Sequence, residues 1–254
     1  MPGVQGRTAL VTGASRGIGL ATARLLIQQG ARVMAVSRSA ADLAATGLEH
    51  YVAADLSTLD GCQRAVEATL TAFDCQSIDL LIVNHGIGSA HEVPLYEQDM
   101  DTFQQSIQTN LQGPYYLTRL VMPLQVAQKY GRCVYTSSTA AIDAEYAGAG
   151  YNTSKTGLLG LMRSVCQDGG PHNITANAVC PGWVRTEMAD RSAAAEAQQR
   201  KTTVEHIWAE RSALASAKRV VTPEEVAHTI VFLASEESSG VSGESIRVSL
   251  GCPI

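Results

Sequence analysis

Short apolar runs alternate with longer stretches of helical spacing along the whole chain, and no other feature of the sequence constrains the fold as strongly. Strand-like runs are predicted at residues 7–12, 32–36, 50–54, 78–83, 132–136, 174–179 and 245–248. Helical spacing is predicted at residues 18–29, 40–45, 59–73, 99–128 and 150–166 and from Thr222 onward. The stretch 99–128 is expected to break or kink around Gly113-Pro114 and at Pro123. This order predicts an α/β fold, a doubly wound parallel β-sheet flanked by helices on both faces. Because no linker or repeat interrupts it, we expect a single domain over residues 1–254.

The composition excludes several classes of protein. The chain is 45% hydrophobic with a formal net charge of -5 and has no Lys/Arg run, which disfavours nucleic-acid binding. No apolar run is long enough for a membrane span, and the N-terminus lacks the pattern of a signal peptide. The six cysteines form no CxxC pair, and the six histidines lack the spacing of metal ligands. We expect a cytoplasmic protein without a metal and with reduced thiols, and disulfides are the alternative for the cysteines.

A glycine-rich turn, residues 12–19 (TGASRGIG), joins the first predicted strand to the first predicted helix. Gly13, Gly17 and Gly19 allow a tight turn and close approach of a phosphate to the backbone. The free N–H groups at the helix start then face an anion. A plain strand-to-helix turn is one alternative. Another is a hydrolase nucleophile elbow, because residues 13–17 also spell GxSxG around Ser15, but no glycine-rich oxyanion segment precedes it.

The end of the second strand indicates which dinucleotide the turn would hold. An NAD-binding fold carries Asp or Glu at this point to bind the ribose hydroxyls, whereas this chain has Ser37 followed by Arg38. Together with Arg16 in the glycine turn, Arg38 can clamp a 2′-phosphate through charge-assisted hydrogen bonds. The pattern predicts NADP(H). The alternative is that both arginines are surface charges, and Asp42, the nearest acid, lies too far along to replace the missing carboxylate.

A tyrosine and a lysine one helical turn apart supply acid/base chemistry. Tyr151 and Lys155 share one helix face, and a nearby ammonium is expected to lower the phenol pKa. Such a phenol can protonate an alkoxide or deprotonate an alcohol. Ser138 follows a strand and could place a hydroxyl against the substrate oxygen. Its neighbour Ser137 is the alternative, and Asn110 is either a solvated helix residue or a buried holder of a proton-passing water.

These motifs, in this order over essentially the whole chain, resemble the short-chain dehydrogenase/reductase family in its single-domain Rossmann form. The resemblance rests on residues 12–19, 55–56, 83–86 (VNHG), Asn110, Ser138, the Tyr151–Lys155 pair and residues 181–186 (PGWVRT). It implies hydride transfer between a nicotinamide and a small-to-medium carbonyl or secondary alcohol, with ketone reduction as the expected direction. The implied catalytic residues are Asn110, Ser138, Tyr151 and Lys155. The implied cofactor-binding residues are Gly13, Ser15, Arg16, Gly17, Ile18, Gly19, Ser37, Arg38, Asp55, Leu56, Asn84, Gly86, Tyr151, Lys155, Pro181, Gly182, Val184 and Thr186.

The resemblance also implies roles for single residues and regions. Asp55 would contact the adenine, Asn84 would support the sheet beside the cofactor, and residues 181–186 would hold the carboxamide. His85 stands where the family has a small residue, and it either shapes the substrate pocket or fills space. Residues 187–218 would form a long loop that serves as a substrate lid, with Trp208 packing the lid itself. A homotetramer or homodimer is expected.

Two other functions stay open on the same fold. One is a non-redox isomerase or cyclase that keeps the cofactor as a scaffold. The other is a nucleotide-sensing protein without turnover. The presence of Asn110, Ser138, Tyr151 and Lys155 together favours the oxidoreductase over both, although a fold by itself does not define a function.

Overall fold

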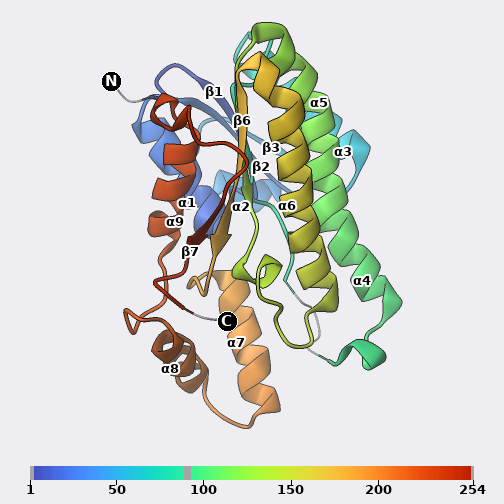
Figure 1. Cartoon of the computed structure of the whole chain (residues 1–254), viewed down its shortest axis with the longest axis vertical. Helices are drawn as coiled ribbons and strands as arrows, with labels where there is room; N and C mark the ends of the chain where they lie inside the picture. Colours follow the sequence, from blue (N-terminus) through green and yellow to red (C-terminus); the bar gives the residue numbers. More distant parts are fainter. Residues whose placement is uncertain (1–2, 89–92, 253–254) are drawn as a thin grey trace.

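One seven-stranded parallel sheet runs through the part of the chain that the computed structural model describes, residues 3–88 and 93–252 (Figure 1). Its strand order is β3-β2-β1-β4-β5-β6-β7, and every neighbouring pair is parallel. The strands are β1 (Thr8–Thr12), β2 (Arg32–Ser37), β3 (Tyr51–Ala53), β4 (Leu80–Val83), β5 (Gly131–Thr136), β6 (Ile174–Pro181) and β7 (Ser245–Val248). The order reverses between β1 and β4, which is the position where ligands bind in open α/β sheets.

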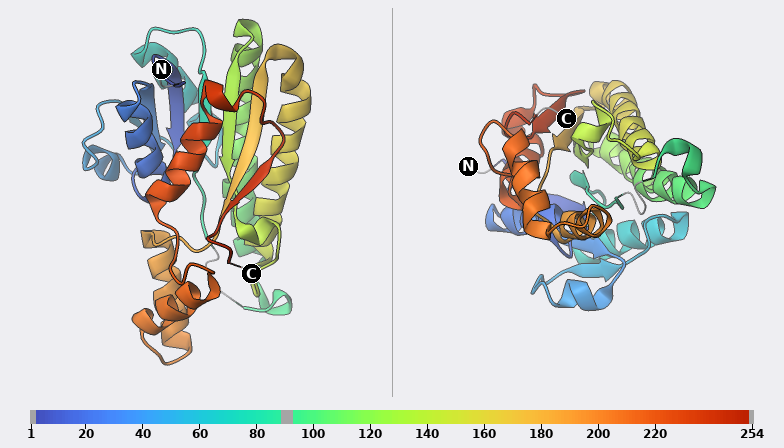
Figure 2. Two further views of the ribbon diagram at one scale, coloured as in Figure 1. Left: turned by 60° about the vertical axis from the view of Figure 1, so that its left-hand side comes forward. Right: turned by 90° about the horizontal axis from the view of Figure 1, so that it is seen from below.

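Helices cover both faces of the sheet, as the alternating pattern predicted (Figures 1 and 2). One face carries α1 (Gly17–Gln28) and α9 (Pro223–Leu233), and the short α2 (Ala40–Ala44) packs against β2 and β3. The other face carries α3 (Leu59–Ala72), α4 (Met100–Ile107), α5 (Gly113–Gln128) and α6 (Ala149–Gly169). Short 3₁₀ helices lie at Leu95–Glu97, Thr139–Ala141, Gly170–His172 and Glu236–Ser238.

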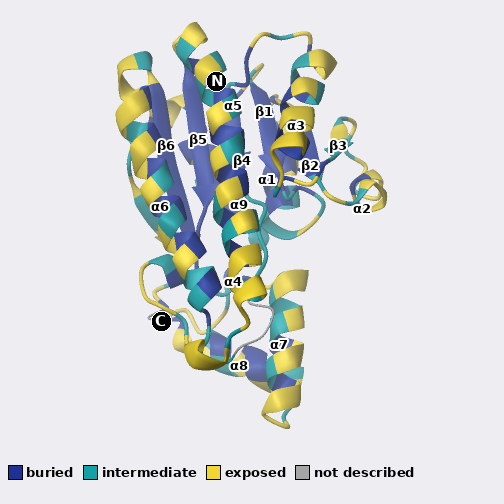
Figure 3. Cartoon of the chain, turned by 90° about the vertical axis from the view of Figure 1, so that its right-hand side faces the viewer, coloured by how far each residue is buried: buried dark blue, intermediate teal, exposed yellow. Residues whose placement is uncertain are grey.

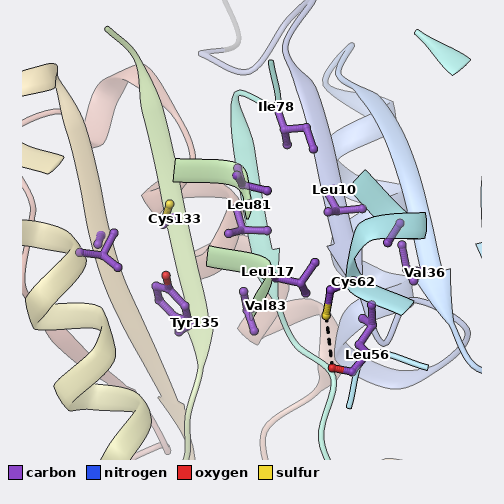
Figure 4. Packing of buried hydrophobic residues seen from close by; sticks show 14 of the residues in the cluster. Leu10, Val36, Leu56, Cys62, Ile78, Leu81, Val83, Leu117, Cys133 and Tyr135 are labelled. Atoms are coloured by element: carbon purple, nitrogen blue, oxygen red, sulfur yellow. Dashed lines mark hydrogen bonds between the residues drawn. The ribbon is translucent and has the colours of Figure 1, made fainter. Parts of the chain in front are cut away.

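The two faces of the sheet contribute to separate hydrophobic clusters. β1 and β4 are buried at every position, as expected for parallel strands covered on both sides (Figure 3). On the α3, α5 and α6 face, Leu10, Leu81 and Leu117 pack together (Figure 4). On the α1 and α9 face, Val11 packs with residues such as Leu26 and Ile230. This double core holds the carboxyl ends of the strands in place.

Polar caps explain where most of the helices begin. The side chains of Ser39, Thr58, Asp99, Thr186 and Thr203 each accept a hydrogen bond from a first-turn amide, and Thr222 forms a full capping box. The helix predicted over residues 99–128 is interrupted by a π-helical turn at Gln108–Gln112, immediately before the expected break at Gly113. Its second proline, Pro123, lies inside α5.

The segment after β6 differs most from its prediction. Residues 187–218 were expected to form a long loop, but they contain two helices, α7 (Glu187–Gln199) and α8 (Val204–Leu214). Ala193, Ala197, Ile207 and Trp208 give these helices a small core of their own, which confirms the packing expected for Trp208. The α7–α8 segment (residues 187–218) extends beyond the carboxyl ends of the strands (Figure 1). In the described part of the chain, no helix is both long and apolar enough to cross a membrane.

Candidate active site

The residues singled out from the sequence gather along one edge of the sheet. The glycine turn follows β1, Ser37 and Arg38 lie at the end of β2, and Asp55 follows β3. Residues 84–86 follow β4, and Ser138 follows β5. Pro181 is the last residue of β6, and residues 182–186 follow that strand. Asn110 comes from the π-helical turn, whereas Tyr151 and Lys155 come from α6. Because all strands are parallel, segments far apart in sequence meet at this edge.

The glycine turn has the backbone geometry of a phosphate cradle. Gly13 and Gly17 have φ values of +64° and +53°, which side-chain-bearing residues rarely adopt. A Cβ on Gly19 would overlap the carbonyl oxygen of Gly13, so the turn folds directly against the helix start. Unlike the N-caps of the helices capped by Ser, Thr or Asp, the N-cap residue of α1, Arg16, makes no side-chain hydrogen bond to the first turn. The first-turn amides of α1 are therefore not satisfied by a cap and fit a dinucleotide pyrophosphate.

The hydroxyl of Thr12 ties the glycine turn to the loop after β4. Its Oγ1 accepts hydrogen bonds from the backbone amides of Asn84 at 2.8 Å and His85 at 3.1 Å. His85 Nδ1 lies 2.8 Å from the same oxygen. The Asn84 amide group donates to the Gly13 carbonyl at 3.5 Å, so Asn84 contacts the glycine turn, and its expected role beside the cofactor stays a prediction. His85 therefore fills the space beneath these two loops, and its ring reaches toward Gly113, where a Cβ would lie 3.1 Å from Nε2.

The segment after β3 carries the residues expected around adenosine. Asp55 Oδ1 accepts from the Ser57 amide at 3.1 Å and from the Ser57 hydroxyl at 2.8 Å. Burial alone would raise the pKa of Asp55, but the Ser57 hydrogen bonds and the charge of Arg38 lower it below its usual value. Leu56 is 4% exposed and belongs to the core, so a contact of Leu56 with a ligand would be through its backbone.

Arg16 does not point freely into solvent. Its guanidinium donates to the carboxylate of Glu187, at the start of α7, and its NH2 lies 3.5 Å from Asp42 Oδ2. Asp42 was expected to lie too far along to replace the missing ribose acid. The structure shows that it reaches Arg16 instead. Arg16 is therefore a half-exposed surface charge with two carboxylate partners, and its contact with a cofactor phosphate stays a prediction.

The loop after β6 is held by contacts with β7 and with the segment that follows β5. Gly182 donates its amide to the Val248 carbonyl at 3.1 Å, and the Pro181 carbonyl accepts from the Thr139 hydroxyl at 3.2 Å. The Val184 side chain lies in the core beside Val221, so a contact of Val184 with the cofactor would be through its backbone. Thr186 caps α7, and its methyl group would lie 3.2 Å from a Cβ on Gly17. The loop after β6 thus contacts the glycine turn through Thr186 and Gly17.

Tyr151 and Ser138 form the reactive pair of side chains. Ser138 is buried, and its Oγ accepts from the Ala140 amide at 3.1 Å. Its hydroxyl is close enough to the Tyr151 phenol to lower the pKa of that phenol. The alternative candidate, Ser137, turns the other way and donates its hydroxyl to the Lys155 carbonyl at 2.9 Å. Among the two serines, Ser138 is therefore the one placed beside the phenol.

Lys155 reaches the site from one helical turn beyond Tyr151. It is 5% exposed, and its Nζ donates to the Thr136 carbonyl at 2.9 Å. The same Nζ lies 5.7 Å from the centroid of the Tyr151 ring. A Cβ on Gly86 would lie 3.4 Å from Lys155 Nζ and 3.1 Å from Asn110 Oδ1. Gly86 thus keeps open a space that borders both side chains.

Asn110 is fully buried, so the alternative of a solvated helix residue is wrong. Its Oδ1 accepts from the Ile87 amide at 2.8 Å, and its Nδ2 donates to the Ile87 carbonyl at 2.9 Å. Nδ2 also donates to the Ser154 hydroxyl at 3.1 Å. Asn110 therefore fixes the loop after β4 against α6, and its expected role in holding a water stays a prediction.

Known proteins share this arrangement of fold and motifs. The family model described as enoyl-(acyl carrier protein) reductase matches residues 13–252. The chain is 32% identical over 248 residues to the 3-oxoacyl-[acyl-carrier-protein] reductase of Rickettsia conorii, covering 97% of this chain and 96% of the relative. The aldohexose dehydrogenase of Thermoplasma acidophilum superposes with a TM-score of 0.89 at 26% identity, over 99% of this chain and 95% of that one. Levodione reductase gives the same TM-score and identity over 97% of each chain.

The chain belongs to the short-chain dehydrogenase/reductase family. The fold class and the family resemblance expected from the sequence are both confirmed. Membership makes this dehydrogenase/reductase an oxidoreductase that transfers hydride with a nicotinamide cofactor and acts on small-molecule substrates. The glycine cradle and the uncapped start of α1 fit the pyrophosphate of that cofactor.

Electrostatics in the protein alone differ from the expectation for Tyr151. Burial and the nearby Glu145 carboxylate raise the pKa of Tyr151 to about 12, and the Ser138 hydrogen bond only partly opposes them. Burial also lowers the pKa of Lys155 to about 8. The expected lowering of the tyrosine pKa is therefore wrong for the protein by itself, because desolvation of the phenolate and the charge of Glu145 raise that pKa. At neutral pH the phenol of this dehydrogenase/reductase keeps its proton and is ready to donate it.

His85 gives the fold of this dehydrogenase/reductase a measurable sensitivity to acid. Burial and the charge of Lys155 lower its pKa from 6.5 to about 3, and its Nε2 has no hydrogen-bond partner among the described residues. Between about pH 6.5 and pH 3, the unfolded chain binds a proton at this position that the folded protein rejects. The contribution of His85 to stability is therefore fully present above pH 6.5 and is lost as the pH falls, by at most about 1.4 kcal/mol per pH unit.

We expect the His85→Ala variant to lose less stability on acidification than the wild type. The free energy of unfolding in urea, measured for both proteins at pH 7.5 and pH 5, should fall by about 1–2 kcal/mol less in the variant. Its stability at pH 7.5 should be lower, because the contact with Thr12 is gone. An equal fall in both proteins would assign the acid sensitivity to other groups.

Sequence reasoning missed several contacts that position the site. The Thr12 hydroxyl, the Thr136 carbonyl and the backbone of Ile87 each hold one of the predicted residues in place. Thr12 could have been recognised, because it directly precedes the glycine turn. The Thr136 and Ile87 contacts use backbone atoms and leave no signal in the sequence. Glu187 was assigned only to the lid, and its pairing with Arg16 could not be read from sequence.

Proposed function

We propose that the protein is an NADP(H)-dependent ketoreductase for small-to-medium carbonyl compounds. The observation that carries this proposal is the buried contact of Ser138 with Tyr151, with Lys155 one turn away. Two relatives bear the names 3-oxoacyl-[acyl-carrier-protein] reductase and levodione reductase, which also favours reduction. We propose residues 187–218 as the substrate lid and a homotetramer or homodimer as the assembly.

The chain's own residues divide the work of the reduction. The bound nicotinamide supplies the hydride. Ser138 donates a hydrogen bond to the carbonyl oxygen and stabilises the negative charge that develops there. Tyr151, whose raised pKa keeps it protonated, transfers its hydroxyl proton to that oxygen. Lys155, held by the Thr136 carbonyl, would bind the nicotinamide ribose and keeps a positive charge near the phenol. Asn110 holds the loop that borders this space.

Arg16, Ser37 and Arg38 are the residues proposed to bind the 2′-phosphate. Arg38 is close enough to Asp55 and His85 to influence both electrostatically, and Ser37 lies beside it at the end of β2. No carboxylate occupies the position of Ser37, so the ribose acid of NAD-binding folds is missing. A doubly charged phosphate would find hydrogen-bond donors at both arginines.

Turnover with NADPH and NADH, followed by loss of absorbance of the reduced nicotinamide, tests the proposal. The panel should contain ketones, diketones, quinones and β-ketoesters. We expect reduction of at least one class, and faster reduction with NADPH than with NADH. Tight NADPH binding without turnover on any member would contradict the ketoreductase assignment and favour an isomerase or cyclase with a scaffold cofactor.

Replacing Arg38 with alanine is expected to weaken NADPH binding about 10- to 100-fold, the effect of losing charge-assisted hydrogen bonds to the phosphate. NADH binding should change little, because NADH lacks that phosphate. Dissociation constants from fluorescence titration measure both. Arg64→Ala is the matched control, since it removes the same charge from an exposed position on α3. Equal losses for the two cofactors would remove Arg38 from the phosphate site.

A further inference from the structure

Three consecutive residues at the start of α7 contact the glycine turn and the loop after β4. Thr186 packs against Gly17 in the glycine turn. Met188 packs against Gly88 in the loop after β4, where a Cβ would lie 3.7 Å from the methionine sulfur. Glu187, between them, pairs with Arg16. The α7–α8 segment is thus attached to the glycine turn by an ion pair as well as by van der Waals contacts.

Two carboxylates hold the half-exposed guanidinium of Arg16. Its NH1 donates to Glu187 Oε2, and its NH2 lies 3.5 Å from Asp42 Oδ2. The side chains of Arg16 and Asp42 are each 47% exposed and that of Glu187 is 52% exposed, so all three can rearrange in solvent. The hydrogen bond from Arg16 lowers the pKa of Glu187, which keeps this carboxylate charged at neutral pH.

A 2′-phosphate needs the same donors. The guanidinium presents its N–H groups in a planar fork, and a fork that holds two carboxylates cannot also bind a phosphate in full. Binding of the phosphate therefore requires Arg16 to leave at least one carboxylate. The ribose of NADH carries no such group, so NADH leaves the ion pair with Glu187 intact.

Glu187 can release Arg16 without becoming an isolated charge. Its other oxygen, Oε1, lies 3.5 Å from Arg191 NH2, one turn along α7. Glu187 is also the first residue of α7, where the helix dipole stabilises a negative charge. Arg16 thus exchanges one anion for another, and the negative charge of Glu187 stays close to Arg191 and to the start of α7.

We propose that Glu187 sets the preference between NADPH and NADH by competing with the 2′-phosphate for Arg16. The inference rests on the proposed use of NADP(H). The free energy needed to break the ion pair with Glu187 offsets part of the binding free energy that Arg16 contributes to NADPH. The start of α7 therefore stays attached to the glycine turn with NADH and is released with NADPH.

The test compares dissociation constants of NADPH and NADH for Glu187→Gln by fluorescence titration. The ratio of the NADH constant to the NADPH constant should rise about two- to fivefold, the range expected for loss of an exposed ion pair. Glu205→Gln removes the same charge from an exposed position on α8 and should leave the ratio unchanged. In an Arg16→Ala background, Glu187→Gln should have no further effect on the ratio.

Each other outcome overturns the inference. An unchanged ratio in Glu187→Gln would show that Glu187 does not compete. An equal rise with and without Arg16 would show a long-range charge effect in place of competition. If Arg16→Ala and Arg38→Ala both leave NADPH binding unchanged, the 2′-phosphate site itself is wrong. That result separates a failure of the proposed function from a failure of the role of Glu187 alone.

Discussion

The Tyr151→Phe variant is expected to lower kcat by about 10²- to 10⁴-fold, the usual contribution of a positioned general acid. The substitution removes only the hydroxyl, so the ring keeps its packing beside Lys155 and Ser138. The raised pKa of Tyr151 means that the wild-type phenol carries the proton to be transferred. NADPH should bind the variant nearly as well as it binds the wild type.

Steady-state rates and NADPH titrations of the same preparations measure this effect. Tyr96→Phe is the matched control, because it removes a phenol hydroxyl from a side chain that is 85% exposed. It should have the kcat of the wild type. Full activity in Tyr151→Phe would remove Tyr151 from the mechanism, whereas loss of NADPH binding would assign it to the cofactor site alone.

The Gly19→Ala variant should lose both stability and cofactor binding. The added methyl group would overlap the Gly13 carbonyl and lie 2.6 Å from Asn84 Nδ2, so the glycine turn must shift. Such overpacking costs about 1–3 kcal/mol of stability. Displaced amides would weaken NADPH binding about 10- to 100-fold, as expected when a hydrogen bond to a charged group is lost.

Thermal unfolding and NADPH titration together test the effect of Gly19→Ala. Gly160→Ala is the matched control on α6, because a Cβ there meets nothing within 4 Å. It should leave cofactor binding unchanged and stabilise the protein by up to about 1 kcal/mol, since alanine is the better helix former. If Gly19→Ala binds NADPH as well as Gly160→Ala does, the turn is not the phosphate cradle.

Elements with a strong apolar pattern could be predicted from the sequence, and elements with a weak apolar pattern could not. The strands over residues 8–12 and 80–83 lie within two residues of their predicted bounds, because continuous apolar runs can be satisfied only inside the sheet. The α7–α8 segment was expected to be a loop. Its short helices bury mainly alanines and one tryptophan, so its apolar pattern is weak. The π-helical turn at Gln108–Gln112 also lacks a sequence signal other than the glycine and proline that follow it.

The sequence by itself determined the order of the strands and of most of the helices between them, and it supplied the proposed phosphate turn and the proposed acid/base residues. These features depend on residues close together in the chain, where spacing reports geometry directly. The tertiary structure alone decided which of two serines faces Tyr151, and it placed Asn110 in the interior. It also brought Arg16 to Glu187, 171 residues away. Desolvation and ion pairing depend on what surrounds a group in space, so the local sequence carries no record of them.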